Sequence, residues 1–175
     1  NNNQELNLDK IEKLNHEKNE LYKKIYSNLD PWQKVQVSRH GERPHTLDYT
    51  KQIFDDIVLL HGDKKYADDN AIVGGLGKID GISVFFIGNE KGNTMETRIK
   101  HNFGMAKPEG YRKAQRLLNL AEKFKLPLIS FVDTAGAFPG KDAEERGQSE
   151  SIASSILHFL KSKIPTISII IGEGG

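Results

Sequence analysis

Two apolar runs of this sequence each lead directly into a glycine-rich loop that could stabilise negative charge. The first loop follows 127–132 and reads Asp133-Thr-Ala-Gly-Ala-Phe-Pro-Gly140. The second follows 165–171 and reads Gly172-Glu-Gly-Gly175. Glycine lets a ligand approach backbone N–H groups without steric hindrance from a side chain. Fixed amides stabilise a developing oxyanion by a few kcal/mol per donor, so the two loops indicate carbonyl chemistry that needs no catalytic side chain.

The commoner motifs built on glycine loops do not fit these residues. A phosphate-binding loop needs four residues between its glycines and Ser or Thr after the lysine. Here three residues separate Gly136 from Gly140, and Asp142 follows Lys141. A nucleophile elbow needs glycine where Ser151 stands and a strand before it. We therefore expect no nucleoside triphosphate site, and we expect Ser149 to be a surface or packing residue.

The titratable residues offer no convincing general base. His40, His45 and His61 lack the spacing of a metal site, and we expect surface or capping histidines. His101 is interpreted as a structural residue, with a ligand role left open. Asp68 and Asp69 form an acidic pair that is expected to cap or solvate a turn.

Basic residues are concentrated between positions 91 and 116. They are Lys91, Arg98, Lys100, Lys107, Arg112, Lys113 and Arg116. Two interpretations stay open at this point. The group is either a solvated helix face or the docking site of an anionic cofactor or acidic partner, for which a few positive charges suffice.

The elements that must position the loops follow an α/β pattern. The apolar runs that precede the loops are separated by a helix-length segment, which predicts parallel strands buried on both faces. Runs 71–77 and 82–87 surround Asp80-Gly81, a strong hairpin signal. Pro108 opens a helix whose predicted buried side is Tyr111, Ala114, Leu117, Leu118, Ala121 and Phe124.

The N-terminal third is predicted to be helical. Residues 1–30 form an amphipathic arm that needs a partner surface, and 31–175 form the main domain. The arm's apolar stripe comprises Ile11, Leu14, Leu21, Ile25 and Leu29. Pro31 suits the first turn of a second helix, and Thr46 is the expected N-cap of a third that reaches Gly62.

Composition narrows the class of protein. The 175 residues carry a net charge of +1, which argues against nucleic acid as the main partner. No cysteine is present, which excludes disulfides and thiolate zinc sites. No apolar run approaches the roughly 18 residues of a membrane span, so we expect no membrane partner. This composition is that of an intracellular α/β domain. Because the chain stops directly after a strand pattern, we also expect it to be C-terminally incomplete.

Several motifs in one order carry a resemblance to a known family. They occupy 41–49, 66–69, 102–105, 108–114 and 143–150, together with the two glycine loops. With these motifs the chain resembles the α subunits of the multi-subunit acetyl-CoA carboxylase carboxyltransferase, over essentially all of 30–175. The resemblance implies an α/β, crotonase-like fold, a spiral of ββα units preceded by the helical arm.

The family's activity follows as an expectation. It is transfer of a carboxyl group from carboxybiotin, tethered to the biotin carboxyl carrier protein, to acetyl-CoA, giving malonyl-CoA for fatty-acid synthesis. The implied partners are the carboxyltransferase β subunit, in an α2β2 assembly, and biotin carboxylase. The β subunit brings most of the acetyl-CoA side and, in many members, zinc, so this chain is expected to bind no metal and to act only with β. The expected location is the cytoplasm, or the stroma of a plastid-like organelle.

Site residues are carried over by position. Gly136 and Ala137 match the first oxyanion loop, and Gly174 and Gly175 begin the second, which in the family continues as Ser-Gly-Gly-Ala. The present chain is therefore expected to be unable to complete the site alone. Ala135 replaces a proline common in the family. The residues predicted to contact the cofactor are Lys91, Arg98, Phe138 and Gly140.

Two other functions stay open. A free-standing crotonase-like hydratase or hydrolase would need a carboxylate near the loops, for which Glu144 and Glu173 are the candidates. A non-catalytic assembly module would use the glycines for packing alone.

Overall fold

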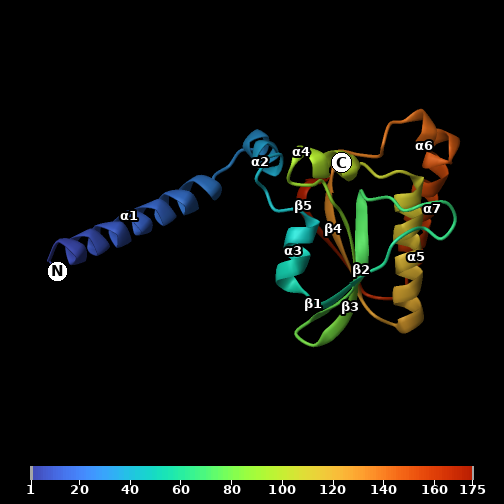
Figure 1. Cartoon of the computed structure of the whole chain (residues 1–175), viewed down its shortest axis with the longest axis horizontal. Coiled ribbons are helices and arrows are strands. Elements are labelled where there is room, and N and C mark those ends of the chain that lie inside the picture. The colour runs from blue at the N-terminus through green and yellow to red at the C-terminus, as the bar shows by residue number, and fades with distance from the viewer. Residues whose placement is uncertain (1, 175) are drawn as a thin grey trace. The chain divides into compact units, whose positions relative to one another are not determined.

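The computed structural model describes residues 2–174, with side chains from residue 8 onward, and divides into two compact units, Asn1–Val37 and Ser38–Gly175 (Figure 1). In the first unit, α1 (Asn2–Tyr26) is a single helix. Helix α2 (Pro31–Ser38) begins at Pro31, as predicted. Asp30 and Gln33 form a reciprocal capping box, each side chain accepting the other's backbone N–H at 2.8–2.9 Å. The domain boundary predicted between residues 30 and 31 stays a prediction.

The second unit is built on a mixed five-stranded sheet in the order β1-β2-β3-β4-β5 (Figure 1). The strands are β1 (Asp55–Leu59), β2 (Ile72–Ile79), β3 (Ile82–Asn89), β4 (Leu128–Thr134) and β5 (Thr166–Gly174). The pairs β1–β2 and β2–β3 are antiparallel, and β3–β4 and β4–β5 are parallel. The predicted hairpin at Asp80-Gly81 is confirmed, and both turn residues have positive φ, which suits the twist of a two-residue turn.

Helices connect and cover the strands. They are α3 (Thr46–Ile53), α4 (Met95–Lys100), the short 3-10 helix η1 (Asn102–Gly104), α5 (Pro108–Phe124), α6 (Lys141–Glu145) and α7 (Gln148–Lys161). Helix α5 lies between β3 and β4 in the chain, and α6 and α7 lie between β4 and β5. The parallel strands that end in the glycine loops are therefore confirmed.

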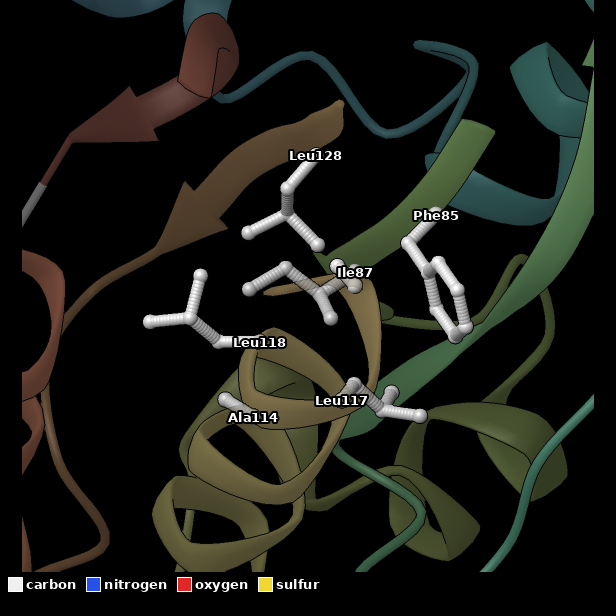
Figure 2. Close-up of a cluster of buried hydrophobic side chains, with 7 residues drawn as sticks. Phe85, Ile87, Ala114, Leu117, Leu118 and Leu128 are labelled. Carbon is white, nitrogen blue, oxygen red and sulfur yellow. The ribbon is translucent and has the colours of Figure 1, made fainter. Parts of the chain in front are cut away.

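One core lies between α5 and the sheet. Figure 2 shows Ala114, Leu117 and Leu118 of α5 facing Phe85, Ile87 and Leu128 of β3 and β4. Burying a side chain of this size stabilises the fold by about 1.5–3 kcal/mol. A second core comprises Phe54, Val84, Phe86, Phe131 and Ile171. Because successive residues of a strand point to opposite faces, β3 supplies both cores.

The helix predicted from Thr46 to Gly62 is wrong in its second half. Helix α3 ends at Ile53, and β1 follows. Phe54 is buried and stacks on Phe86, with ring centroids 5.1 Å apart, and β1 pairs with β2. Pairing with β2 and the strand preference of β-branched side chains outweigh a helical spacing that was fortuitous. The N-cap is His45, one residue before the predicted Thr46.

The expectation that both parallel strands are buried on both faces is wrong for β5. Ile167, Ile169 and Ile170 are 41–68% exposed, and β5 lies at the edge of the sheet. An apolar strand has the same sequence pattern whether or not a neighbour covers it. The predicted buried side of α5 is also too long, because Phe124 at its end is exposed.

Candidate active site

Three neighbouring parallel strands each place a charged residue at the same edge of the sheet. Lys91 follows β3 by two residues, Asp133 lies near the end of β4, and Glu173 lies near the end of β5. Carboxyl ends of parallel strands meet at one edge, where open α/β sheets bind ligands. The Nζ of Lys91 lies 2.9 Å from Oδ1 of Asp133 and 2.6 Å from Oε2 of Glu173.

Asp133 is the most deeply buried member of this group, with a side chain 1% exposed. It also accepts a hydrogen bond from Nδ1 of His45 at 3.0 Å and one from the backbone N–H of Glu173 at 3.0 Å. Burial acts to raise the pKa of Asp133, but the hydrogen bonds from His45, Lys91 and Glu173 hold the pKa below its ordinary value. Because an ionised carboxylate only accepts, Nδ1 of His45 carries the proton in this bond.

Glu173 is held by two cations. Besides Lys91, the Nε of Arg39 donates to its carboxylate at 2.6 Å. The pKa of Glu173 lies below its ordinary value, mainly because of the hydrogen bond from Lys91. Burial acts to raise this pKa, and the hydrogen bond from Arg39 lowers it further. We call Arg39, His45, Lys91, Asp133 and Glu173 the strand-end cluster.

Close packing at the cluster depends on a glycine in the second loop. A Cβ at Gly172 would overlap the carboxylate of Asp133. The carbonyl of the preceding Ile171 accepts a hydrogen bond from Nε of Arg43. The start of the second loop therefore packs directly against the cluster, and position 172 must be a residue without a side chain.

A cavity of about 340 Å³ opens beside the cluster. Its lining includes all five cluster residues together with Arg98, Phe103, Met105 and Ala135. Three basic side chains in this lining face two carboxylates, an electrostatic balance that suits an anionic ligand group. His45 is 5% exposed, and its Nε2 is buried without a hydrogen-bond partner among the described residues. A buried nitrogen left unpaired is costly, so a ligand hydrogen-bond donor fits this position.

The first glycine loop begins at the cavity with Ala135. Gly136 has φ of +144°, and its N–H donates to the Thr134 hydroxyl at 3.1 Å. Ala137 forms a parallel bridge with Ala106, next to a hydrogen bond of 3.0 Å from the Phe138 N–H to the Ala106 carbonyl. The loop is thus fixed from both sides.

The second loop runs beside the first. Thr134 of β4 is paired with Gly174 of β5, so both loops leave the sheet at adjacent positions. Gly175 lies outside the described residues. Of the four residues predicted to form the oxyanion loops, the structure therefore describes Gly136, Ala137 and Gly174, and it brings the start of both loops to the strand-end cluster.

The four residues predicted to contact the cofactor separate into two groups. Lys91 and Arg98 line the cavity. Arg98 donates from Nε to the Gly92 carbonyl at 3.2 Å and from an Nη to the Gly41 carbonyl at 3.1 Å. Phe138 and Gly140 are not among the described residues that line it. The ring of Phe138 lies 4.6 Å from Nζ of Lys107, and Gly140 is the N-cap of α6.

Sequence reasoning misses the cluster as a unit. His45 is expected at the surface or in a capping role; it is the N-cap of α3, but it is buried against Asp133. In the sequence Asp133 is only part of a glycine loop, and Glu173 only a candidate base. The available signal is positional: each charged residue comes at or just after the end of an apolar run, where parallel strands converge.

Other expectations have mixed outcomes. The solvated-face interpretation is wrong for Lys113, which is 2% exposed. The capping role of Asp69 is confirmed, because its carboxylate accepts the N–H groups of Ala71 and Lys107 at 2.9 and 2.7 Å. His101 is buried, with Nδ1 lying 2.6 Å from the Asn70 carbonyl. Ser149 is exposed, as predicted.

The described residues contain neither a metal-binding group nor a helix that could span a membrane. Among them, no group of three or more His, Cys, Asp or Glu side chains is arranged to hold a metal ion. No helix in this part of the chain has both the length and the apolar composition needed to cross a membrane.

Solved structures share this fold. The chain aligns with transcarboxylase 12S, solved with methylmalonyl-coenzyme A and methylmalonic acid bound, at a TM-score of 0.61 and 22% identity, over 75% of this chain and 24% of that one. A single-chain, multi-domain long-chain acyl-CoA carboxylase aligns at a TM-score of 0.60 and 25% identity, over 78% of this chain and 13% of that one. These neighbours confirm the predicted crotonase-like fold.

Curated relatives are more similar to this chain in sequence than these solved structures are. The chain is 56% identical over 167 residues to the acetyl-coenzyme A carboxylase carboxyl transferase subunit alpha of Paramagnetospirillum magneticum, and 57% identical over 167 residues to that of Rhodospirillum centenum. Both alignments cover 95% of this chain and 53% of the relative, so the chain spans about half the length of these curated relatives. A family model described as acetyl co-enzyme A carboxylase carboxyltransferase-like matches residues 1–175. The chain therefore belongs to the acetyl co-enzyme A carboxylase carboxyltransferase-like family.

Proposed function

We propose that this chain forms part of a carboxyltransferase site that moves a carboxyl group from carboxybiotin on a carrier protein to acetyl-CoA, giving malonyl-CoA for fatty-acid synthesis. The observation that carries the proposal is the pair of glycine loops that leave adjacent strands at one edge of the sheet, where Thr134 pairs with Gly174. The relatives named above as carboxyl transferase α subunits support the same reaction.

In this proposal the loops stabilise negative charge through backbone amides. Gly136 and Ala137 act in the first loop, and Gly174 and Gly175 in the second. A fixed amide in a dry site lowers the energy of a developing oxyanion by a few kcal/mol. The Gly136 N–H, now bonded to the Thr134 hydroxyl, would exchange that partner for the reacting oxygen. The same hydroxyl donates to the Gly136 carbonyl at 2.8 Å, so it can keep the loop in place when the N–H turns to another acceptor.

The cavity supplies the binding side. Carboxybiotin, when bound, supplies the carboxyl group that is transferred. Lys91 and Arg39 are paired with the two carboxylates of the lining, so the charge of Arg98 favours a negatively charged group, and Nε2 of His45 accepts a hydrogen bond from the bound molecule. Phe138 and Gly140, predicted to contact the cofactor, would act from the outer part of the first loop.

The assembly is also a proposal. The active form contains a carboxyltransferase β subunit, which contributes most of the acetyl-CoA side, in an α2β2 arrangement. Biotin carboxyl carrier protein and biotin carboxylase complete the system, and the chain itself holds no metal. Residues 1–30 serve as a helical arm and 31–175 as the catalytic part. Bacterial relatives favour the cytoplasm as the location, with an organelle stroma as the alternative.

The competing enzyme class has less support. A crotonase-like hydratase or hydrolase would need a carboxylate that is free to take a proton. Glu173 is committed to Lys91 and Arg39, and Glu144 is exposed outside the residues that line the cavity. A non-catalytic assembly role gives no reason for the cluster to line a cavity.

Partner dependence tests the proposal. The full-length counterpart of this chain is assayed for malonyl-CoA-dependent carboxylation of free biotin, with and without its β subunit. We expect activity only in the mixed sample. Turnover of an enoyl-CoA by the α subunit alone, or no carboxylation with β present, would reject the proposed reaction.

A matched pair of glycine variants tests the first loop. Gly136 and Gly81 both have positive φ, and a Cβ at either position meets no atom within 4 Å. Alanine at either position therefore costs backbone strain, about 1–3 kcal/mol, without a clash, and the strain is greater at the φ of +144° of Gly136 than at the φ of +79° of Gly81, which lies closer to the left-handed helical region. We expect Gly136→Ala to lower kcat about tenfold or more and Gly81→Ala, at the far hairpin turn, to leave kcat unchanged. Equal kcat values in the two variants would show that Gly136 has no part in turnover.

A further inference from the structure

We propose that Lys91 is a positioning residue, whose ammonium bridges Asp133 and Glu173 and so holds the two glycine loops at the separation that carboxyl transfer requires. This inference rests on the proposed function. It concerns how the loops are held, whereas the proposed function concerns what their amides do.

The bridge joins the two loops near their starts. Asp133 stands three residues before Gly136, and Glu173 directly precedes Gly174. Oδ1 of Asp133 receives both the Lys91 ammonium at 2.9 Å and the backbone N–H of Glu173 at 3.0 Å. The Glu173 carboxylate receives the same ammonium at 2.6 Å. If either loop shifted, the ammonium could no longer contact both carboxylates.

Electrostatics make this ammonium hard to replace. Two carboxylates that are shielded from water repel each other, and removing the cation between them leaves an uncompensated buried charge. Lys91 is 16% exposed and contacts both, whereas Arg39 is 59% exposed and its ion pair is with Glu173. Without Lys91 the loops would separate so that water could reach the carboxylates.

An alternative role for Lys91 is direct attraction of a substrate anion. The two roles differ in kinetics. A residue that binds a substrate equally in its ground and transition states raises KM when it is removed, whereas a misplaced catalytic group lowers kcat. They also differ in rescue, because deleting one of the two carboxylates relieves repulsion between the loops but cannot restore a lost ligand contact.

The experiment uses the full-length protein in complex with its β subunit. We expect Lys91→Met to lower kcat about a hundredfold, the size of effect that a misplacement of about 1 Å produces. KM for malonyl-CoA and for biotin should stay within about twofold. In Lys91→Met/Glu173→Gln we expect kcat to recover at least about tenfold. Lys78→Met, which removes an exposed ion pair with Asp56, is the control and should match the unchanged protein.

Three outcomes overturn the inference: a raised KM with kcat unchanged in Lys91→Met, no recovery in the double variant, or wild-type kcat in Glu173→Gln alone. That single variant breaks the bridge from the other side. We expect it to lower kcat about tenfold, so the test holds even if Lys91→Met does not fold.

Hydrogen exchange separates failure of this inference from failure of the proposed reaction. In the same complex, we expect Lys91→Met to speed amide exchange in 133–138 and 172–174, and the double variant to slow it again. Unchanged exchange in both segments rejects the bridge whatever the activity. Faster exchange in Lys91→Met, together with no carboxylation by the unchanged complex, supports the bridge and rejects the reaction.

Discussion

Lys91 and Lys113 are both shielded from water, but their partners differ in kind. The ammonium of Lys113 donates to the backbone carbonyls of Asp69 and Ile72 at 2.8 and 2.6 Å and pairs with the Asp68 carboxylate. Lys91 instead bridges two side-chain carboxylates, on β4 and β5, and lines the cavity. One lysine fastens α5 to the chain segment that enters β2, and the other joins two loops that face a ligand.

The difference separates stability from geometry. A lysine that donates to backbone carbonyls holds one chain segment in the fold. A lysine between two carboxylates sets the distance between the elements that carry them. The same residue type thus contributes to the fold in one place and to the proposed site in the other, and each role predicts a different loss on substitution.

The largest expected effect tests the structural lysine. Lys113→Met removes donors from two carbonyls and a partner from Asp68, so we expect the free energy of unfolding to fall by about 3 kcal/mol. Urea unfolding measures it, with the exposed Lys123→Met on the same helix as a control that should change it by less than about 0.5 kcal/mol. In the full-length complex, kcat per folded molecule should be unchanged. A large fall in kcat would end the distinction between the two lysines.

A smaller effect tests the packing of the cluster. In Gly172→Ala the new Cβ overlaps the Asp133 carboxylate, which Lys91 and His45 hold in place. We expect a loss of about 1–3 kcal/mol in the free energy of unfolding, as for other overpacked sites. Gly174→Ala, whose Cβ meets only Ile170 atoms at 3.6 Å, should cost less. Equal losses would mean that Asp133 yields, and that the cluster is not rigid.

The smallest effect is a pH dependence at the structural lysine. Burial raises the pKa of Asp68, but hydrogen bonds from Lys113 and Gly62 lower it from 3.8 to about 2. A lowered folded-state pKa stabilises the protein above the unfolded value, and this stabilisation is lost as pH falls through the folded value. We therefore expect the urea concentration at the unfolding midpoint to decrease as the pH is lowered from 4 to 2, and to decrease more steeply in the unchanged protein than in Asp68→Asn. Identical slopes in the two proteins would contradict the ion pair.

Much of the fold was predictable because its signals are local. Asp80-Gly81 between two apolar runs determines a hairpin, and Pro108 starts α5. Strand β1 is not predictable from its own residues, because its identity depends on pairing with β2, which no local spacing records. The exposure of β5 is not predictable for a related reason, since burial depends on neighbours that the strand's own residues do not specify.

The candidate site was predictable only in part. The glycine loops are visible in sequence because glycines gathered at a strand end mark a tight turn or a close approach to the backbone. The strand-end cluster is not visible, since His45 precedes α3 while its partner Asp133 lies near the end of β4, 88 residues away. Charge pairing over such distances is a product of the folded sheet, and single residues such as His45 and Glu173 look ordinary in sequence.

Strand β3 has a consequence for how the sheet finds its register. It supplies Phe85 and Ile87 to one core and Val84 and Phe86 to the other, so a slip of one residue would exchange one apolar set for another. Hydrophobic pattern alone cannot penalise that error. Gly88 can, because a Cβ at this position would overlap Thr46, and a slip would bring Ile87 or Asn89 there. In this sheet, the apolar residues of β3 determine that the strand is buried, and a glycine determines its register relative to the neighbouring strands.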